Sequence, residues 1–266
     1  MDIVRLVEYI KEWELFDKID FDQIVSDYNF GIKNVLYIKK ISDLEKVQKN
    51  KKTLFILDKI LVENISDFFD MGNISILDLN AGLFSYGNKI WISKCDIMDL
   101  MKKWFDIFEP IDLFSILNIL DKTGKNYIRV SNVDLPTNFV DSKECEIVSL
   151  EDKWFLWNMT LISSWMMFTE VIRLGNLLNE QGIHVKIKIL NKLNFDGTLK
   201  DDENIVFILD LLNYNEYENY LKEKLKWKNL NFIYPSYQKL STMMDEYKME
   251  ELEFDVLNLA NKLLKK

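Results

Sequence analysis

NVLYIKKISDLEKVQKNKKTLFIL, residues 34–57, carries the pattern that decides the fold. Two short apolar runs, rich in β-branched and aromatic residues, flank a polar stretch with helical character. The same kind of run returns as ISILDL at residues 74–79 and as KIWIS at residues 89–93. Runs that are apolar on both faces are typical of strands buried on both sides. The sequence therefore predicts an α/β protein with a mostly parallel sheet covered by helices.

Helices are expected on both sides of these runs. Residues 1–30 predict an amphipathic helix, because apolar side chains recur three and four positions apart. Two interpretations stay open for its apolar face, which packs either on the protein's own body or on a partner. Residues 96–108 and 110–120 predict two more helices, the second opened by Pro110. The N-terminal apolar face consists of Ile3, Leu6, Val7, Ile10 and Trp13.

A linker precedes a second set of alternating elements. The stretch NVDLPTNFVDSKE, residues 132–144, is polar, lacks periodicity and contains Pro136. A predicted helix at about 165–181 ends beside Gly182, which suits a left-handed C-terminal position. A final helix is expected at 250–264. The strands predicted beyond the linker are 146–149, 154–157, 159–163, 184–190, 204–212 and a last run that starts at Leu230.

Composition narrows the classes of function. The chain has 266 residues, 48% hydrophobic content, and 34 basic against 43 acidic side chains, for a net charge of -9. That charge repels nucleic acid, and no apolar run is long enough to predict a membrane span. Cys95 and Cys145 do not form a disulfide pattern. We expect a cytoplasmic protein that binds neither nucleic acid nor membrane.

Few residues are available for chemistry. With one histidine, His184, and two cysteines, the chain offers no self-sufficient catalytic site. A zinc site would need Cys95, Cys145 and His184, which share no ligand spacing, so no metal site is predicted. Two further groups are interpreted as structural. They are the carboxylates Asp96, Asp99, Asp106 and Glu109, read as a solvated helix face, and Trp154, Trp157 and Trp165, read as core or interface aromatics rather than a sugar-stacking site.

Several strings, in order, resemble transketolase and related thiamine diphosphate enzymes. NYIRVSNVDLP, residues 126–136, is similar to the end of the family's pyrimidine domain, and NMTLISS, residues 158–164, to a strand of its carboxy-terminal domain. The stretch from Phe168 to Asp196 resembles the helix, turn and strand that follow, although Asn194 and Phe195 replace the family's proline segment. Upstream, residues 81–93 resemble an Ala-Gly-Leu-Ala helix followed by a strand.

The resemblance implies a defective cofactor site. The family's catalytic glutamate lies nine positions before the glycine that matches Gly82, which places Asn73 there. An amide cannot exchange the proton that a carboxylate does. Asp78 is five positions out of register, and the interval from Ser93 to Pro110 is too short for the family's substrate-binding segment. No Gly-Asp-Gly motif is present, so magnesium and diphosphate would need a partner chain.

The sequence thus predicts two Rossmann-like domains behind an N-terminal helix. Residues 1–30 form the helical segment, 31–135 a shortened pyrimidine-like domain, 136–145 a linker, and 146–266 a transketolase carboxy-terminal-like domain. The first functional hypothesis is a non-catalytic structural or regulatory subunit that forms a homodimer or joins a transketolase-like partner.

The alternative is the carboxy-terminal subunit of a split transketolase or related 2-oxo-acid enzyme. Such a subunit would bind thiamine diphosphate and magnesium only with a partner chain. A third interpretation limits the resemblance to that of one βαβ unit to another, because a shared fold does not fix a function.

Overall fold

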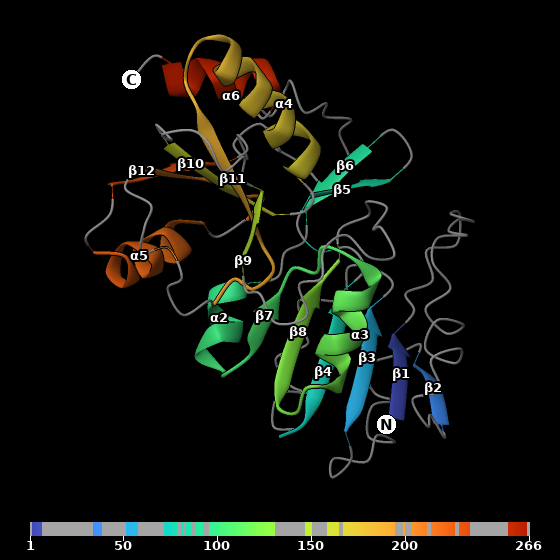
Figure 1. The fold of residues 1–266 in the computed structure, drawn as a ribbon. Coiled ribbons are helices and arrows are strands. Elements are labelled where there is room, and N and C mark those ends of the chain that lie inside the picture. The colour runs from blue at the N-terminus through green and yellow to red at the C-terminus, as the bar shows by residue number, and fades with distance from the viewer. Residues whose placement is uncertain are drawn as a thin grey trace.

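The computed structural model shows two large, mainly parallel sheets with helices on their faces (Figure 1). It describes residues 2–6, 34–38, 52–57, 72–78, 81, 83–86, 89–92, 96–130, 147–150, 159–164, 167–194, 199, 204–211, 214–226, 229–234 and 255–264. The first sheet lies in the part of the sequence before the predicted linker and the second lies after it. The linker falls outside the described residues, so the predicted domain limits stay predictions.

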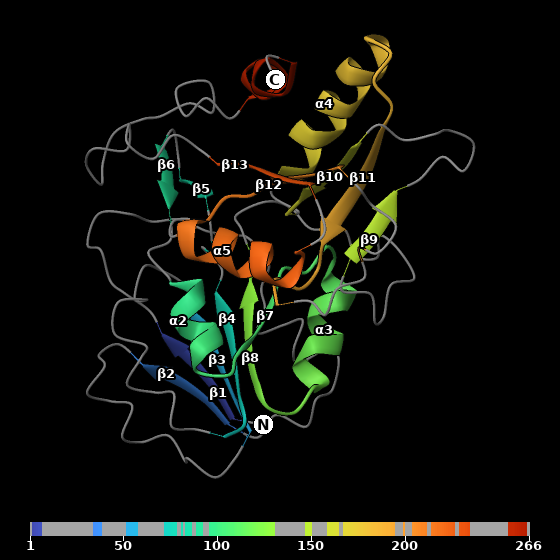
Figure 2. The ribbon, with the colours of Figure 1, turned by 90° about the vertical axis from the view of Figure 1, so that its left-hand side faces the viewer.

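The first sheet has six strands, all parallel, in the order β2-β1-β3-β4-β8-β7. Figure 2 shows α2 and α3 on either side of it. Its strands are β1 (Asp2–Leu6), β2 (Asn34–Ile38), β3 (Thr53–Leu57), β4 (Ile74–Asp78), β7 (Asp106–Phe108) and β8 (Lys125–Arg129), and its helices are α2 (Ile97–Lys102) and α3 (Leu113–Asp121). The buried strands β3, β4 and β8 confirm the expectation of a sheet covered on both faces.

The second sheet has five strands in the order β13-β12-β10-β11-β9, of which β9 alone is antiparallel. Helices α4 and α6 cover one face and α5 covers the other (Figure 2). The strands are β9 (Ile147–Leu150), β10 (Met159–Ser163), β11 (Val185–Leu190), β12 (Asn204–Ile208) and β13 (Asn229–Ile233), and the helices are α4 (Phe168–Glu180), α5 (Tyr214–Lys224) and α6 (Val256–Leu264).

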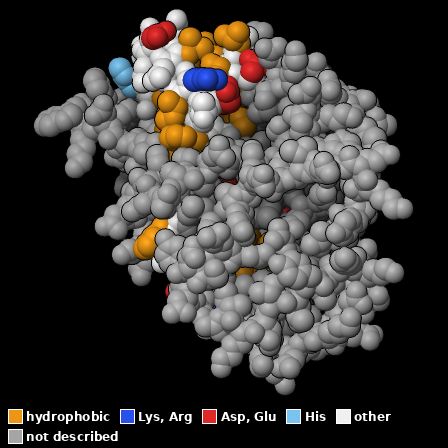
Figure 3. Space-filling model, turned by 90° about the vertical axis from the view of Figure 1, so that its right-hand side faces the viewer, with side chains coloured by type: hydrophobic (Ala, Val, Ile, Leu, Met, Phe, Trp, Pro, Cys, Tyr) orange, Lys and Arg blue, Asp and Glu red, His pale blue; other side chains and the backbone are white. Residues whose placement is uncertain are grey.

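Helix α4 confirms the predicted helix and its end. Its buried face includes Val171, Leu174 and Leu178, and Gly182 follows with φ of 77° in the left-handed region. At Gly175 a Cβ atom would lie 2.9 Å from Ile187 Cδ1, so the glycine lets the helix approach β11 closely. On the face shown in Figure 3, apolar side chains with charged ones among them gather at the end of the molecule that carries α4.

The predicted N-terminal helix is wrong where it can be judged. Residues Asp2–Leu6 form β1, which pairs with β2 on one side and β3 on the other. Ile3 and Val4 are β-branched, and pairing with two parallel neighbours outweighs the helical spacing of the apolar side chains. Val7, Ile10, Trp13 and the rest of the 7–30 segment lie outside the described residues.

Three further expectations are corrected. Residues 96–108 do not form one helix, because α2 ends before Trp104, whose φ is 67°, and the chain continues into β7. The string similar to the family's Ala-Gly-Leu-Ala helix forms an antiparallel hairpin of β5 (Leu83–Tyr86) and β6 (Lys89–Ile92). Helix α3 begins after the cap Asp112, so Pro110 precedes its first turn. Helix α5 was not predicted at all.

Candidate functional site at the joined carboxyl edges

The carboxyl edges of the two sheets are the natural place to look for a site. In open α/β sheets, ligands bind outside the carboxyl ends of the strands, at the point where the strand order reverses. In the second sheet this reversal lies between β10 and β12, since β11 adds on one side of β10 and β12 on the other. Ser164 directly follows β10, and Asp210 comes two residues after β12. The Ser164 hydroxyl donates to Asp210 Oδ1 at 3.0 Å, across this reversal point.

The carboxyl edge of the first sheet supplies the matching groups. Arg129 is the last residue of β8, and Glu109 directly follows β7. The Arg129 guanidinium donates to Glu109 Oε1 and lies 4.0 Å from Asp210 Oδ2. We call Arg129, Glu109, Asp210 and Ser164 the Arg129 cluster. It joins the carboxyl edges of the two sheets.

Burial sets the electrostatic character of the Arg129 cluster. The side chains of Arg129, Glu109 and Asp210 are 5%, 6% and 3% exposed. One guanidinium therefore faces two carboxyl groups away from water, where an uncompensated charge is costly. Within the described residues, Glu109 Oε2 and Ser163 Oγ are buried without a hydrogen-bond partner. Because the charged side chains of the Arg129 cluster are buried, the loss of any one of them leaves another without its partner.

A second polar contact lies at the carboxyl end of β4. Asp78 is 2% exposed and accepts a hydrogen bond from the Tyr127 hydroxyl through Oδ2. The backbone fixes it further, because the Val130 amide donates to the Asp78 carbonyl at 2.8 Å. Asp78 is therefore held in one orientation on the same edge as Arg129, although its carboxylate is already engaged.

Asn73 lies at the opposite end of β4. It precedes the strand, and its Oδ1 accepts a hydrogen bond from the Gly124 amide at 3.3 Å. Gly124 has φ of 103° and forms the turn before β8, so Asn73 steadies that turn. The residue predicted at the position of the catalytic glutamate is thus at the amino edge of the first sheet, away from the Arg129 cluster.

The four carboxylates read as one solvated helix face have separate roles, which corrects that expectation. Asp96 caps α2 by accepting from the amides of Met98 and Asp99 at 2.9 and 3.1 Å. Asp99 pairs with Lys103 at 2.7 Å. Asp106 lies on β7, and Glu109 is buried against Arg129. The stretch failed as a single helix because the chain turns at Trp104 and re-enters the sheet.

The other candidates for chemistry are not brought together. His184 is partly exposed between α4 and β11. Cys95, Cys145, Trp154, Trp157 and Trp165 lie outside the described residues. Among the residues that the structure describes, no three histidine, cysteine, aspartate or glutamate side chains are grouped to hold a metal.

Sequence reasoning did not identify the members of the Arg129 cluster as a group. Arg129 was noted only as part of a string similar to the family, and Asp210 was part of a predicted strand. A signal was nevertheless present, since a charged residue stands at the carboxyl end of three apolar runs, at Glu109, Arg129 and Asp210. What the sequence does not contain is which edges face each other.

The comparisons with known proteins agree with this architecture. No family model and no curated protein matches the chain. Among solved structures, a split-gene transketolase described as an inactive beta4 tetramer superposes with a TM-score of 0.64 at 14% identity, over 99% of this chain and 91% of that one. Transketolases from Campylobacter jejuni and Pichia stipitis each give a TM-score of 0.55, at 14% and 13% identity.

These likenesses establish a transketolase-like fold. The chain spans only 36% of the Campylobacter enzyme and 34% of the Pichia enzyme, whereas it matches the split-gene chain almost end to end. The predicted resemblance and α/β fold are confirmed at this level. Within the described residues, no helix is long and apolar enough to cross a membrane.

Proposed function

We propose that this chain is a subunit of a split transketolase or related 2-oxo-acid enzyme that works with a partner chain. The observation that carries the proposal is the end-to-end match in length and fold to a split-gene transketolase chain, at 99% and 91% coverage. That chain is described as an inactive tetramer of beta subunits, which is in line with a subunit that does nothing alone.

The residues of this chain do not fit thiamine diphosphate and magnesium by themselves. The sequence has no Gly-Asp-Gly motif, and no three described side chains are grouped as metal ligands. The carboxylates at the carboxyl edges are engaged, Asp78 by Tyr127 and both Glu109 and Asp210 by Arg129. In this proposal the diphosphate and magnesium are held by the partner chain.

A non-catalytic structural or regulatory subunit is the second candidate. It is supported by Asn73, whose amide accepts a hydrogen bond from Gly124 and does not ionise as the carboxylate of a general acid or base does. It is also supported by the Arg129 cluster, which occupies the carboxyl edges with contacts within the chain. In this role the chain would act through its surfaces, as a homodimer or in complex with a transketolase-like partner.

Calorimetry and activity together separate the two candidates. The experiment uses this chain, a candidate partner chain that carries Gly-Asp-Gly followed by Asn, and the mixture of both. Each is titrated with thiamine diphosphate and magnesium and assayed for ketol transfer. A split enzyme predicts micromolar binding and turnover in the mixture only, with the partner alone as the control. Binding by the mixture without turnover favours the non-catalytic role, and no binding by the mixture overturns the split-enzyme proposal.

Asn73 provides a variant that tests its own role. Asn73→Asp keeps an oxygen that can accept from the Gly124 amide and adds a carboxylate at the predicted glutamate position. If Asn73 only steadies the turn, the variant leaves ketol transfer by the mixture unchanged. Asn73→Ala is the matched control, because it removes the acceptor without adding a charge. A change in turnover with Asp but not with Ala would place Asn73 at the cofactor.

A further inference from the structure

The two sheets are joined directly by backbone hydrogen bonds. The Leu193 amide donates to the Ile107 carbonyl at 2.8 Å, and the Glu109 amide donates to the Asn191 carbonyl at 2.9 Å. Phe108 and Lys192 form an antiparallel bridge between these bonds. The segment that follows β11 therefore extends the first sheet at its β7 edge.

Asn194 completes this joint with its side chain. Its Oδ1 accepts from the Ile107 amide at 3.0 Å, and its Nδ2 donates to the Phe105 carbonyl at 3.1 Å and to Asp106 Oδ1 at 3.0 Å. Asn194 stands where the family resemblance fails, since it replaces a proline segment. In this chain the replacement holds β7.

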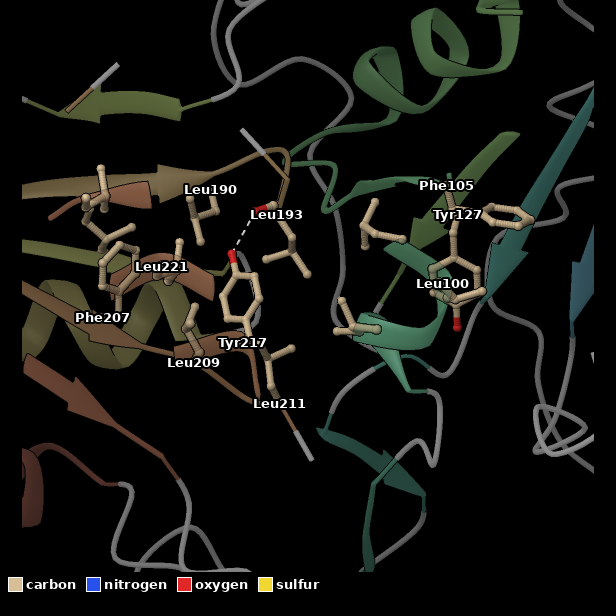
Figure 4. Close-up of a cluster of buried hydrophobic side chains, with 14 of the residues drawn as sticks. Leu100, Phe105, Tyr127, Leu190, Leu193, Phe207, Leu209, Leu211, Tyr217 and Leu221 are labelled. Carbon is tan, nitrogen blue, oxygen red and sulfur yellow. Dashed lines mark hydrogen bonds between the residues drawn. The ribbon is translucent and has the colours of Figure 1, made fainter. Parts of the chain in front are cut away.

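The joint also has an apolar layer. Leu100, Phe105 and Tyr127 of the first unit belong to the same buried cluster as Leu193 and Tyr217 of the second, drawn in Figure 4. The Tyr217 hydroxyl donates to the Leu193 carbonyl at 2.8 Å, the dashed line of Figure 4. One of the two buried clusters in the described residues thus takes side chains from both halves on either side of the predicted linker.

The Arg129 cluster forms the third, ionic layer. Arg129 and Glu109 come from the first unit and Asp210 from the second, so separating the carboxyl edges takes the Arg129 charge away from Asp210. Partial opening leaves the charges poorly paired before water can fully reach them. Replacing such a cluster with apolar side chains is often neutral or stabilising, which means that its charges do not simply add stability. The buried charges are better explained by a role in fixing one particular arrangement of the two units.

We propose that the Arg129 cluster is a conformational lock that holds the two carboxyl edges closed against each other. The apolar and backbone layers supply most of the joint's contacts. Because of this lock, the two carboxyl edges separate only when the whole chain unfolds. This inference concerns the chain alone and does not depend on the proposed enzyme function.

Residue-resolved hydrogen exchange of the full chain tests the lock. The reporters are the Ile107, Glu109 and Leu193 amides at the joint, compared with the amides of β4 and β10 inside the sheets. In the native chain, both sets are expected to exchange at the rate set by global unfolding. In Asp210→Asn, which keeps the shape and removes the carboxylate that the second unit presents to Arg129, the joint amides are expected to exchange at least about 10-fold faster than the sheet amides, as a local opening.

Two comparison variants complete the experiment. Lys102→Met removes an exposed ion pair that bridges the same two units, between Lys102 and Glu216, and should leave both sets of amides unchanged. Glu109→Gln removes the partner of Arg129 within the first unit and keeps the Arg129–Asp210 contact across the joint, so it should accelerate the joint amides less than Asp210→Asn does. A uniform acceleration of all amides in both cluster variants would mean simple loss of stability and overturn the lock. No acceleration at the joint would overturn it as well.

Discussion

Among the ion pairs that bridge the two α/β units in the described part of the chain, Lys102–Glu216 and Arg129–Asp210 differ mainly in burial. Lys102 and Glu216 connect α2 to α5 at 3.0 Å, with side chains 64% and 57% exposed. Arg129 and Asp210 connect the carboxyl edges at 4.0 Å, with side chains 5% and 3% exposed. The pair that is shorter is the one surrounded by water. Distance alone would therefore rank the two contacts in the wrong order.

Burial reverses the ranking because it changes what happens when a partner is lost. An exposed charge that loses its partner is hydrated at once, so its removal costs little. A buried charge has no such replacement, and the remaining partner must bear the cost of desolvation. The comparison teaches that the Arg129 cluster is costly to break even though its net contribution to stability is small.

Arg129→Met is expected to give the largest effect. The change leaves Glu109 and Asp210 buried without their cation, and removing one partner of a buried pair costs about 3 to 5 kcal/mol of unfolding free energy. Urea denaturation followed by circular dichroism measures it.

The control replaces the whole cluster. Arg129→Met combined with Glu109→Leu and Asp210→Leu removes the orphaned carboxyl groups and should recover most of the lost unfolding free energy. If the single and triple variants were equally unstable, packing rather than charge would explain the effect. The argument that burial distinguishes the two ion pairs would then be wrong.

Asn194→Ala is expected to come next. It removes the side chain that binds the Ile107 amide and the Phe105 carbonyl, and it leaves both backbone groups without those partners. The loss of unfolding free energy should be about 2 kcal/mol. Asn194→Asp sharpens the test, since it keeps the acceptor for Ile107 but cannot donate to Phe105 and adds a charge beside Asp106. An Asp variant as stable as the native chain would show that the donor contacts do not matter.

The strands of the second unit could be read from the sequence, whereas the joint could not. Strands β10 and β11 follow from local runs of apolar residues, and Gly182 correctly marks the end of α4. Such features depend on neighbours in the chain. The polar composition of helix α5 gives little apolar signal, and its buried Tyr217 and Leu221 pack into a cluster that contains residues of both units.

The candidate site was missed for a related reason. The pairing of Glu109 with Arg129 spans 20 positions, and Asp210 comes from the far side of the predicted linker. Nothing local specifies that these residues meet. The family resemblance predicts no catalytic residue and marks Asn73 as the position of the missing glutamate, at the other end of β4. The N-terminal residues failed in the opposite way, since a local helical pattern was overruled by strand pairing in β1.

Tyr217→Phe tests the apolar layer of the joint, and it also tests how stability depends on pH. It removes the hydroxyl that donates to the Leu193 carbonyl, at a cost of about 1 kcal/mol near pH 7. Burial raises the pKa of Tyr217 well above its usual value, so the folded chain keeps the proton when the unfolded chain releases it. Stability is thus fully present below pH ~10 and falls as pH rises above it.

The alkaline loss of stability is the checkable consequence. Urea denaturation at about pH 8 and about pH 11 should show a smaller loss for Tyr217→Phe than for the native chain, because the variant has one fewer buried phenol to ionise. Tyr220→Phe removes a neighbouring phenol whose charge is a smaller cause of the raised Tyr217 pKa, so it should reduce the alkaline loss by less than Tyr217→Phe does. An equal loss in the native chain and the Tyr217 variant would contradict the assignment.

Lys102→Met should give the smallest effect on stability. It completes the comparison of the exposed ion pair with the buried one. The Glu216 carboxylate, by its hydrogen bond and its charge, raises the pKa of Lys102, so the pair is formed at neutral pH. Both side chains are nevertheless hydrated when apart, and salt screens their attraction. The denaturation midpoint should stay within the error of the native value, at low and at high salt alike. A loss comparable to that of Arg129→Met would show that the position of a charge at the joint matters more than its burial, and the reasoning behind the lock would fail with it.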